Sequence, residues 1–389
     1  MEVGQFRRID RGNSDIREVG NSPQKSPPSS CDAIGIPSRF FDVATDAPRV
    51  TLSTFASADD LAAMPIRVKV LIYHYVRPAE LRWSERHHVL DLAVFARQLD
   101  FLLDTHTVMS GVEVAALARG ELNRSPGDRP IAWLTFDDGY SDCIRYVLPE
   151  LKARGLTASF LVPTAAVWER RLLAVNAVHL VLALAPTSND VVSEIRHLWR
   201  AMGLRTRSGD DFEAAFRRFG EANAWNDSGS RFVKKVLQKE LPAPVREDLL
   251  GRLLRTIVGS AVDRYAEDLY LTKNDLLWLE RAGMEVGSHG HEHEWLADLD
   301  PRAQRRDLEA SLSLLDSAGL VDPRSVMSYP FGSYSNDTLD IVADLGITFG
   351  LVNDVDAIAD LDVGCGPWLQ VTRIDPMFFG RFFPGWDSA

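Results

Sequence analysis

The sequence has little cysteine, no excess of basic charge and no long apolar run, and each absence excludes a class of protein. The three cysteines, Cys31, Cys143 and Cys365, lie far apart and form no CxxC pair, so neither a disulfide framework nor a cysteine zinc site is predicted. The 43 basic residues against 55 acidic ones give a net charge of −12, which disfavours a nucleic-acid-binding protein. The most apolar stretch, 174–186, is too short for a membrane span, which needs about 20 residues.

The remaining composition is that of a globular protein with a substantial core. The chain has 389 residues, of which 46% are hydrophobic and 25% charged. Residues 1–60 are rich in Ser, Pro, Asp and Arg, and they predict a flexible N-terminal tail. The first 30 residues carry charges where a secretory signal needs an apolar segment, so we expect a cytoplasmic location.

Apolar, β-rich segments alternate with segments of helical periodicity along most of the chain. Strands are predicted over 68–76, 131–136, 157–163, 284–289, 325–332 and 347–353. Helices are predicted over 91–105, 112–119, 141–154, 301–319 and 336–346. This alternation is typical of parallel βαβ units, and the number of units favours a distorted (β/α)7-8 barrel.

A different pattern interrupts the alternation between 165 and 268. This stretch contains long helical patterns and no convincing strand, so we interpret it as a helical insertion. It divides the predicted barrel into a first part over 61–164 and a second part over 269–389. The insertion is expected either to cap the barrel mouth as a lid or to support a homo-oligomer.

Two adjacent carboxylates, Asp137 and Asp138, follow the predicted strand 131–136. In a β/α barrel the carboxyl end of a strand faces the active site. Neighbouring strand residues point in opposite directions, so two functional acids must straddle the bend where the strand ends. One acid would then bind a metal ion while the other contacts a water molecule; a turn that caps the next helix is the structural alternative.

Three of the nine histidines lie within the segment GSHGHEHEWL, directly after another predicted strand. His289 and His293 are four residues apart, a spacing that lets two imidazoles bind one ion, whereas His291 is expected to point away. Together with Asp138 they form a set that leaves coordination positions open, as in catalytic sites. Such an ion activates water and polarises a carbonyl, and Asp137 beside that water would be the base. An HExxH protease helix is excluded because residue 295 is Trp.

Three segments in this order, TFDDGYSD (135–142), SHGHEH (288–293) and SYPFG (328–332), resemble the first three motifs of the polysaccharide deacetylase (NodB-homology) family. The resemblance covers roughly 68–164 and 268–375. It implies a distorted barrel of the NodB type that removes acetyl groups from saccharides.

Carried over residue by residue, the resemblance makes Asp137 the base and Asp138, His289 and His293 the metal ligands. The expected cofactor is one divalent ion, with zinc favoured and Co²⁺, Ni²⁺ or Fe²⁺ as alternatives.

The sequence departs from the family pattern in two places. The third motif usually begins with an Arg that orients the base, but here Ser328 stands there; Arg373 is a candidate replacement, unless it forms a structural ion pair with Asp375. The following turn still offers the backbone N–H of Phe331 as an oxyanion donor. No His follows position 293, so the general acid is predicted to be His74, which matches the early strand of the permuted poly-N-acetylglucosamine deacetylase-like branch. A packed, structural His74 is the alternative.

Aromatic residues beside the motifs are candidates for stacking on a sugar ring. Tyr140, Trp295, Tyr329 and Pro330 are predicted to contact the substrate, and Trp133 and Trp368 are further aromatic candidates; a role in the core is the alternative for each. The sequence therefore predicts a metal-dependent hydrolase that removes an acetyl group from an N-acetylated sugar or an intracellular glycan precursor. An amidase for a non-carbohydrate acetamide and a non-catalytic binding barrel are the alternatives.

Overall fold

The computed structural model describes residues 66–84, 86–123, 128–222, 226–353, 358–361 and 366–386. The predicted tail over 1–60 lies outside the described residues, as do Cys31 and Cys365. Cys143 is described, and it is a free, buried thiol.

The centre of the fold is a sheet whose main strands run parallel. The strands are β1 (Ile66–Tyr73), β4 (Thr107–Val108), β5 (Ile131–Phe136), β6 (Ser159–Val162), β7 (Glu285–Ser288), β8 (Val326–Ser328), β9 (Phe349–Leu351), β10 (Ala359–Leu361) and β11 (Trp368–Val371). Their order is β10-β1-β5-β6-β7-β8-β9-β11, and β1, β5, β6, β7, β8, β9 and β11 form parallel pairs.

The sheet closes on itself after β11. Ile374 forms a parallel bridge with Leu71 of β1, and its backbone N–H donates to the Val70 carbonyl at 2.7 Å. The backbone N–H of Ile72 in turn donates to the Ile374 carbonyl at 3.0 Å. The predicted distorted (β/α) barrel is therefore confirmed.

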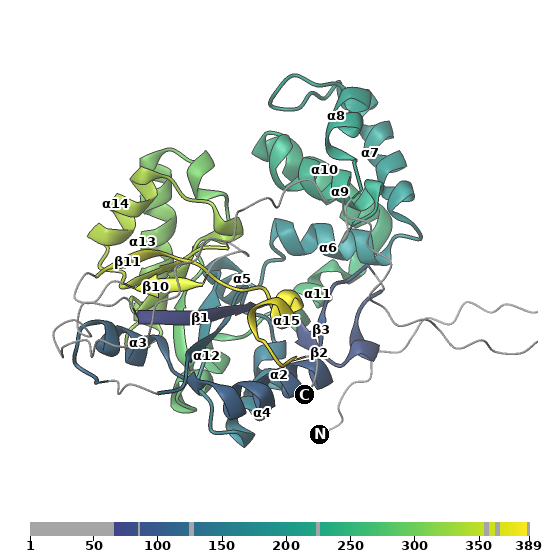
Figure 1. Cartoon of the computed structure of the whole chain (residues 1–389). Helices are drawn as coiled ribbons and strands as arrows, with labels where there is room; N and C mark the ends of the chain where they lie inside the picture. The colour runs from purple at the N-terminus through teal and green to yellow at the C-terminus, as the bar shows by residue number, and fades with distance from the viewer. Residues whose placement is uncertain are drawn as a thin grey trace, which may run out of the picture. The chain divides into compact units, whose positions relative to one another are not determined.

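Helices connect the strands and cover the outside of the barrel (Figure 1). They are α2 (Leu92–Thr105), α3 (Gly111–Ala118), α4 (Leu148–Ala153), α12 (Lys273–Arg281), α13 (Pro301–Ser317), α14 (Asn336–Asp344) and α15 (Phe379–Phe382). Several begin at side-chain caps, and Thr272 with Asp275 forms the capping box of α12.

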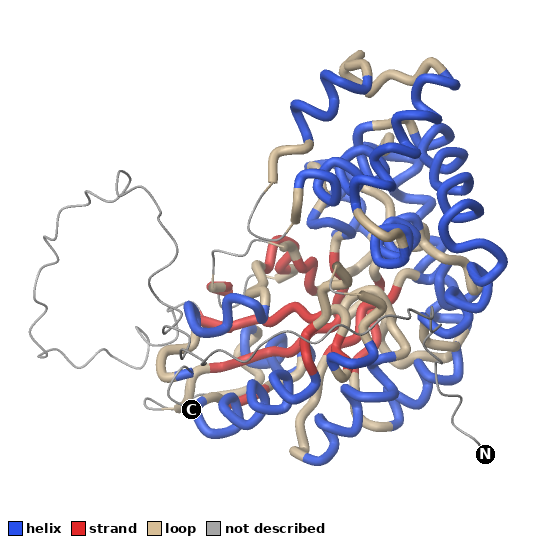
Figure 2. Tube along the Cα trace, turned by 90° about the vertical axis from the view of Figure 1, so that its right-hand side faces the viewer, coloured by secondary structure: helices blue, strands red, loops and turns tan. Residues whose placement is uncertain are grey.

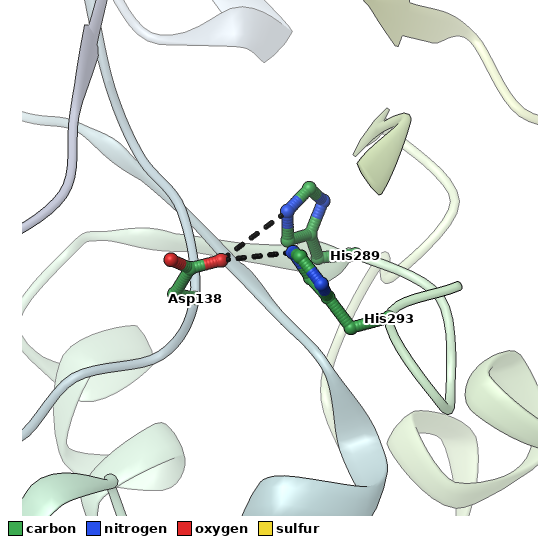
Figure 3. A group of neighbouring side chains, drawn as sticks. All are labelled: Asp138, His289 and His293. Atoms are coloured by element: carbon green, nitrogen blue, oxygen red, sulfur yellow. Dashed lines mark ion pairs between the residues drawn. The ribbon is translucent and has the colours of Figure 1, made fainter. Parts of the chain in front are cut away.

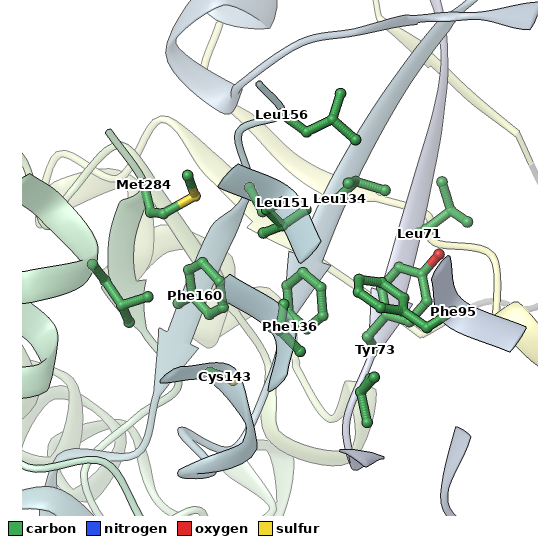
Figure 4. Close-up of a cluster of buried hydrophobic side chains, with 14 of the residues drawn as sticks. Leu71, Tyr73, Phe95, Leu134, Phe136, Cys143, Leu151, Leu156, Phe160 and Met284 are labelled. Carbon is green, nitrogen blue, oxygen red and sulfur yellow. The ribbon is translucent and has the colours of Figure 1, made fainter. Parts of the chain in front are cut away.

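Successive side chains of a strand point to opposite faces of the sheet, and this alternation separates two apolar clusters. On β5 the even-numbered Leu134 and Phe136 face the helices, where Phe136 stacks between Tyr73 and Phe160 with ring centroids 5.0 Å from each (Figure 4). The odd-numbered Trp133 belongs to a second cluster that fills the barrel with side chains from the other strands. Asp137 continues this inward row, so the barrel core leads directly to the strand end where the carboxylates lie.

The described part of 165–268 contains helices and no strand. They are α6 (Ala174–Leu184), α7 (Ser188–Met202), α8 (Phe212–Phe219), α9 (Ser228–Lys235), α10 (Ala243–Leu253) and α11 (Val262–Leu269), preceded by the short α5 (Thr164–Trp168). Figure 2 shows α7 to α10 grouped apart from the strands, and these helices bury an apolar cluster of their own. Among the described residues no helix has the length and apolar character needed to cross a membrane.

Three local features differ from the sequence prediction. The strand predicted over 68–76 ends at Tyr73, and β2 (Val76–Arg77) leaves the barrel to pair with β3 (Leu90–Asp91). The helix predicted over 141–154 starts with a wider π turn over Cys143–Val147 before α4. The antiparallel strand β10 was not predicted, because three residues beside β1 carry too little periodicity to be recognised.

Candidate active site

Side chains from separate strands meet at the carboxyl ends of the barrel strands. His74 follows β1, Asp137 and Asp138 follow β5, and His289 follows β7. Backbone hydrogen bonds fix these junctions: Asp137 N–H donates to the Tyr73 carbonyl at 2.9 Å, and His289 N–H to the Val162 carbonyl at 3.0 Å. The parallel sheet therefore brings together residues that are more than 200 positions apart in sequence.

Asp138, His289 and His293 form a buried group whose ligand atoms lie within 4.8 Å of one another (Figure 3). Asp138 Oδ1 lies 3.4 Å from His289 Nε2 and 3.2 Å from His293 Nε2. This oxygen is buried and has no hydrogen-bond partner among the described residues. A buried carboxylate oxygen without a hydrogen bond, facing two imidazole nitrogens, fits a divalent metal ion.

The backbone at the two ends of this group adopts an uncommon conformation. Asp138 has a φ of 69° and His293 a φ of 56°, in the left-handed region that residues other than glycine rarely enter. Asp307 on α13 helps to hold the histidine loop, because its carboxylate accepts the backbone N–H groups of His291 and Glu292 at 2.9 Å each. Such conformations persist where surrounding contacts enforce them, which is characteristic of functional sites.

Ser328 connects the metal-site histidine to the second carboxylate. His289 Nδ1 lies 2.9 Å from the Ser328 carbonyl and 2.6 Å from Ser328 Oγ, so its N–H points towards both oxygens. This tautomer leaves the Nε2 lone pair available for a metal ion. Ser328 Oγ donates its own proton to Asp137 Oδ1 at 3.1 Å, and thus links the two halves of the site.

Arg373 forms a bidentate ion pair with Asp137 inside the barrel. Its Nη1 donates to Oδ1 at 2.8 Å and its Nη2 to Oδ2 at 2.7 Å, and neither side chain is accessible to solvent. The structure thus places Arg373 where the sequence suggested, as the partner of the predicted base, and it does not record a pair between Arg373 and Asp375 among the described residues. Arg373 and Ser328 occupy both lone pairs of Asp137 Oδ1, and Arg373 occupies one of Oδ2. The remaining lone pair of the carboxylate is on Oδ2, which lies 3.8 Å from His289 Nε2.

The surrounding charges keep both carboxylates ionised. Burial by itself raises the pKa of Asp137, but the positive charges of Arg373 and His289 outweigh it and leave this pKa below its ordinary value. Burial also acts to raise the pKa of Asp138. Its contacts with His289 and His293 act more strongly in the opposite direction and hold this pKa well below its ordinary value. Both carboxylates are therefore anionic at neutral pH.

A network of aromatic hydroxyls holds the other oxygen of Asp138. Tyr140 donates to Asp138 Oδ2 at 2.6 Å, and Asn176 Nδ2 donates to the Tyr140 hydroxyl at 2.6 Å. Asn176 Nδ2 also donates to the Tyr75 hydroxyl at 2.8 Å, and its Oδ1 accepts from Tyr270 at 2.6 Å. Because Asn176 belongs to α6, the helical insertion reaches the metal site through this network.

The Tyr140→Phe variant is expected to weaken metal binding by about 10- to 100-fold, the usual effect of removing a hydrogen bond to a metal-binding side chain. The substitution keeps the ring and removes only the donor to Asp138. Competition with a chromogenic chelator measures the affinity. The matched control is Tyr334→Phe, whose hydroxyl accepts a hydrogen bond from Gln370 at 3.0 Å away from this site. Equal affinities of the two variants would contradict the positioning role of Tyr140.

Four other predicted residues lie beside the buried group. His74 is exposed to solvent and is close enough for a positive charge on it to lower the pKa of Asp137 and of Asp138. Phe331, with a φ of 57°, packs its ring against the His293 imidazole at 4.7 Å, and Trp295 stacks on Phe331 at 4.4 Å. Pro330 is buried at the start of the same turn.

Tyr140 and Tyr329, which were predicted to contact the substrate, have no exposed surface in this structure. Tyr140 belongs to the hydrogen-bond network just described. Tyr329 packs in the core beside α14 and donates to the Leu369 carbonyl at 2.9 Å. Trp133 and Trp368 are also core residues, each packed against Phe349. Of the aromatic candidates, Trp295 keeps a partly exposed ring next to the site.

Sequence reasoning missed Asn176 and Asp307, and did not recognise Ser328 as a connector. Asn176 interrupts a run of apolar residues in α6, and a polar residue within a buried helix is the signal that it has partners. Asp307 occupies a buried position of α13, which is an equivalent signal. His291 points elsewhere, as predicted from its position: its Nδ1 lies 2.9 Å from Thr164 Oγ1.

The comparisons with known proteins support a deacetylase hydrolase. Residues 256–350, which include His289, His293 and the SYPFG segment, match the family model for polysaccharide deacetylase. Over this part of the chain the match agrees with the family predicted from the motifs. A search of curated proteins found no match.

Solved structures similar to the chain include the following three. The Streptococcus pyogenes deacetylase PplD in complex with acetate is 19% identical, with 82% of this chain and 99% of that chain covered and a TM-score of 0.47. IcaB from Ammonifex degensii is 16% identical, with 84% and 99% covered and a TM-score of 0.49. The BpsB deacetylase domain from Bordetella bronchiseptica is 16% identical, with 80% and 96% covered and a TM-score of 0.43.

Proposed function

We propose that the protein is a metal-dependent hydrolase that removes the acetyl group from an N-acetylated sugar. The observation that carries the proposal is the buried set of Asp138, His289 and His293 beside Asp137, which Arg373 holds in one orientation. A carboxylate base next to a three-ligand metal set is the arrangement that amide hydrolysis needs. The family match over 256–350 supports the acetylated saccharide as substrate class.

Asp138, His289 and His293 would hold the ion, and their nitrogen and oxygen donors favour zinc while also suiting Co²⁺, Ni²⁺ or Fe²⁺. When bound, such an ion acidifies a water molecule and polarises the substrate carbonyl. The hydrogen bond from His289 Nδ1 to Ser328 and the one from Tyr140 to Asp138 fix the directions of two of the three ligands.

The chain's own residues would handle the protons and the developing charge. Asp137 accepts a proton from the attacking water through Oδ2, and Arg373 with Ser328 holds its carboxylate in place. The backbone N–H of Phe331 donates to the oxyanion that forms from the acetyl carbonyl. His74, exposed at the end of β1, donates a proton to the departing amine, which is a poor leaving group until it is protonated.

Acetate release from a panel of acetamido sugars and simple acetamides tests the proposal. We expect release from an acetamido sugar by the metal-loaded protein and release slower by about 10²–10⁴-fold by the Asp137→Asn variant. Equal rates on simple acetamides would support the non-carbohydrate amidase instead. No release from any member of the panel would contradict hydrolysis as the function.

The His74→Ala variant is expected to keep its metal and to lose activity on an acetamide by about 10²–10⁴-fold, the usual contribution of a positioned general acid. Activity on an activated acetate ester should change much less, because that leaving group needs no proton. Steady-state kinetics on both substrates measure the difference. His197→Ala on α7, an exposed histidine of the insertion, is the control. Equal losses on both substrates would indicate a packing role for His74.

A further inference from the structure

A hollow lies next to the candidate active site, between the insertion and the barrel. It has a volume of about 280 Å³, and Trp295 and Phe331 form its barrel side. The insertion contributes four cationic side chains from α9 and the turn after it: Arg231, Lys234, Lys235 and Lys239. We call this hollow the basic pocket. Four lysine and arginine side chains around one small pocket are unexpected in a chain whose net charge is −12.

A series of ring contacts joins the basic pocket to the metal site. The His293 imidazole packs against Phe331, with ring centroids 4.7 Å apart, and Phe331 stacks on Trp295 at 4.4 Å with an interplanar angle of 5°. Lys239 Nζ lies 4.1 Å from the centre of the Trp295 ring. The basic pocket therefore adjoins the metal site through Phe331 and Trp295.

Most of the positive charge in the basic pocket is not neutralised by the protein. Lys239 is 3.7 Å from Asp298, but Arg231, Lys234 and Lys235 form no ion pair with a carboxylate in the described part of the chain. Arg231 donates to the Glu221 carbonyl, and Lys234 donates to Asn226 Oδ1 at 2.7 Å. Asp227 is the acidic residue whose charge acts on Lys234, and its carboxylate is already bonded to Ser188 and Ser230.

Two further observations concern donor groups on residues that line the basic pocket. Lys234 is largely buried, and burial lowers its pKa, so a bound anion would relieve an unfavourable charge. The indole N–H of Trp295 is buried and lacks a hydrogen-bond partner among the described residues. Both groups are donors, and neither has a hydrogen bond or ion pair with a carboxylate among the residues that the structure describes.

We propose that the basic pocket binds a phosphate group of the substrate, so that the substrate is an acetamido sugar carrying a phosphate monoester or diester. The proposal rests on the proposed function, because it assumes that the neighbouring site cleaves an acetamide. Three cations without an ion pair among the described residues suit a phosphate better than a carboxylate, because a phosphate brings more acceptor oxygens and, as a monoester, up to two negative charges.

Two kinds of substrate share this chemistry, a soluble nucleotide sugar and a sugar phosphate linked to a lipid. Kinetics with UDP-N-acetylglucosamine and with a lipid-linked N-acetylglucosamine phosphate in detergent micelles distinguish them. N-acetylglucosamine 1-phosphate and free N-acetylglucosamine form the matched pair that isolates the phosphate. We expect kcat/KM to be at least about tenfold higher for the phosphorylated member of the pair, the effect of one charge-assisted contact.

Variants in the basic pocket should remove this preference. Lys235→Gln and Arg231→Gln are each expected to lower kcat/KM for N-acetylglucosamine 1-phosphate by about tenfold and to leave kcat/KM for N-acetylglucosamine unchanged. Arg217→Gln is the control, because Arg217 is an exposed cation of α8 that does not line the basic pocket. Having two separate single variants guards against the failure of one of them to fold.

Calorimetric binding of inorganic pyrophosphate provides a readout that does not depend on acetyl hydrolysis. Binding to the wild type that weakens in Lys235→Gln and Arg231→Gln but not in Arg217→Gln supports the basic pocket, even if no acetamide is cleaved and the proposed function fails. Hydrolysis of N-acetylglucosamine with no phosphate preference and no pyrophosphate binding would overturn the basic-pocket proposal and leave the proposed function standing.

Discussion

Replacing Asp137 with Asn is expected to lower kcat for acetamide hydrolysis by about 10²–10⁴-fold while the bound metal is retained. The change keeps the size of the side chain and removes its ability to accept a proton from water. The metal should remain because Asp137 is not in the ligand set of Asp138, His289 and His293. Kinetics combined with elemental analysis of the same sample measure both quantities.

The neighbouring variant Asp138→Asn is the matched comparison for this prediction. It alters the carboxylate that faces both imidazoles at 3.2 and 3.4 Å, so it should lose metal and activity together. If Asp137→Asn also loses its metal, Asp137 is a ligand and its assignment as base is wrong.

Replacing Arg373 with Met is expected to destabilise the fold by about 3–5 kcal/mol, because it leaves the Asp137 carboxylate buried and without its partner. The same change removes the positive charge that lowers the pKa of Asp137, so this pKa rises. Asp137 acts as a base when deprotonated, and the acidic limb of the pH–activity profile should therefore move to higher pH. Chemical denaturation measures the free energy of unfolding, and kcat/KM across pH measures the limb.

Two further variants separate this effect from the loss of an ordinary ion pair. Arg324 makes an equally bidentate contact with Asp316, at 2.8 and 2.7 Å, but on the surface, so Arg324→Met should cost about 1 kcal/mol or less. The double variant Arg373→Met with Asp137→Asn should recover part of the stability lost by Arg373→Met, since the unpaired charge is gone. An Arg373→Met protein as stable as Arg324→Met would contradict the account of the buried pair.

The sequence predicted the parts of the site that depend on strand ends. Asp137, Asp138 and His289 each follow a strand whose apolar pattern is clear, and the carboxyl ends of parallel strands meet at one end of a barrel. Arg373 was suggested only because the usual position held Ser328. Its contact with Asp137 depends on closure of the barrel after β11, which no local pattern reveals.

The remaining parts depend on contacts between segments distant in sequence. Tyr140 appeared to be a substrate contact because it adjoins the motif, but its hydroxyl is drawn inwards by Asp138 and by Asn176 of the insertion. The basic pocket combines Lys234 and its neighbours in α9 with Trp295, more than 50 residues away. Side-chain partners of this kind follow from how the insertion packs on the barrel. They could not be predicted because the periodicity of α9 indicates only which face of this helix is apolar.

The central claim is that Asp138, His289 and His293 hold one catalytic divalent ion, and the metal content of three histidine variants tests it most directly. Elemental analysis of His289→Ala and His293→Ala should show a strong loss of metal, because each removes a nitrogen that faces Asp138 Oδ1. His291→Ala should retain nearly the full content, since His291 contacts Thr164 outside this group. Equal metal loss in all three variants, or full metal content in all three, would contradict the claim.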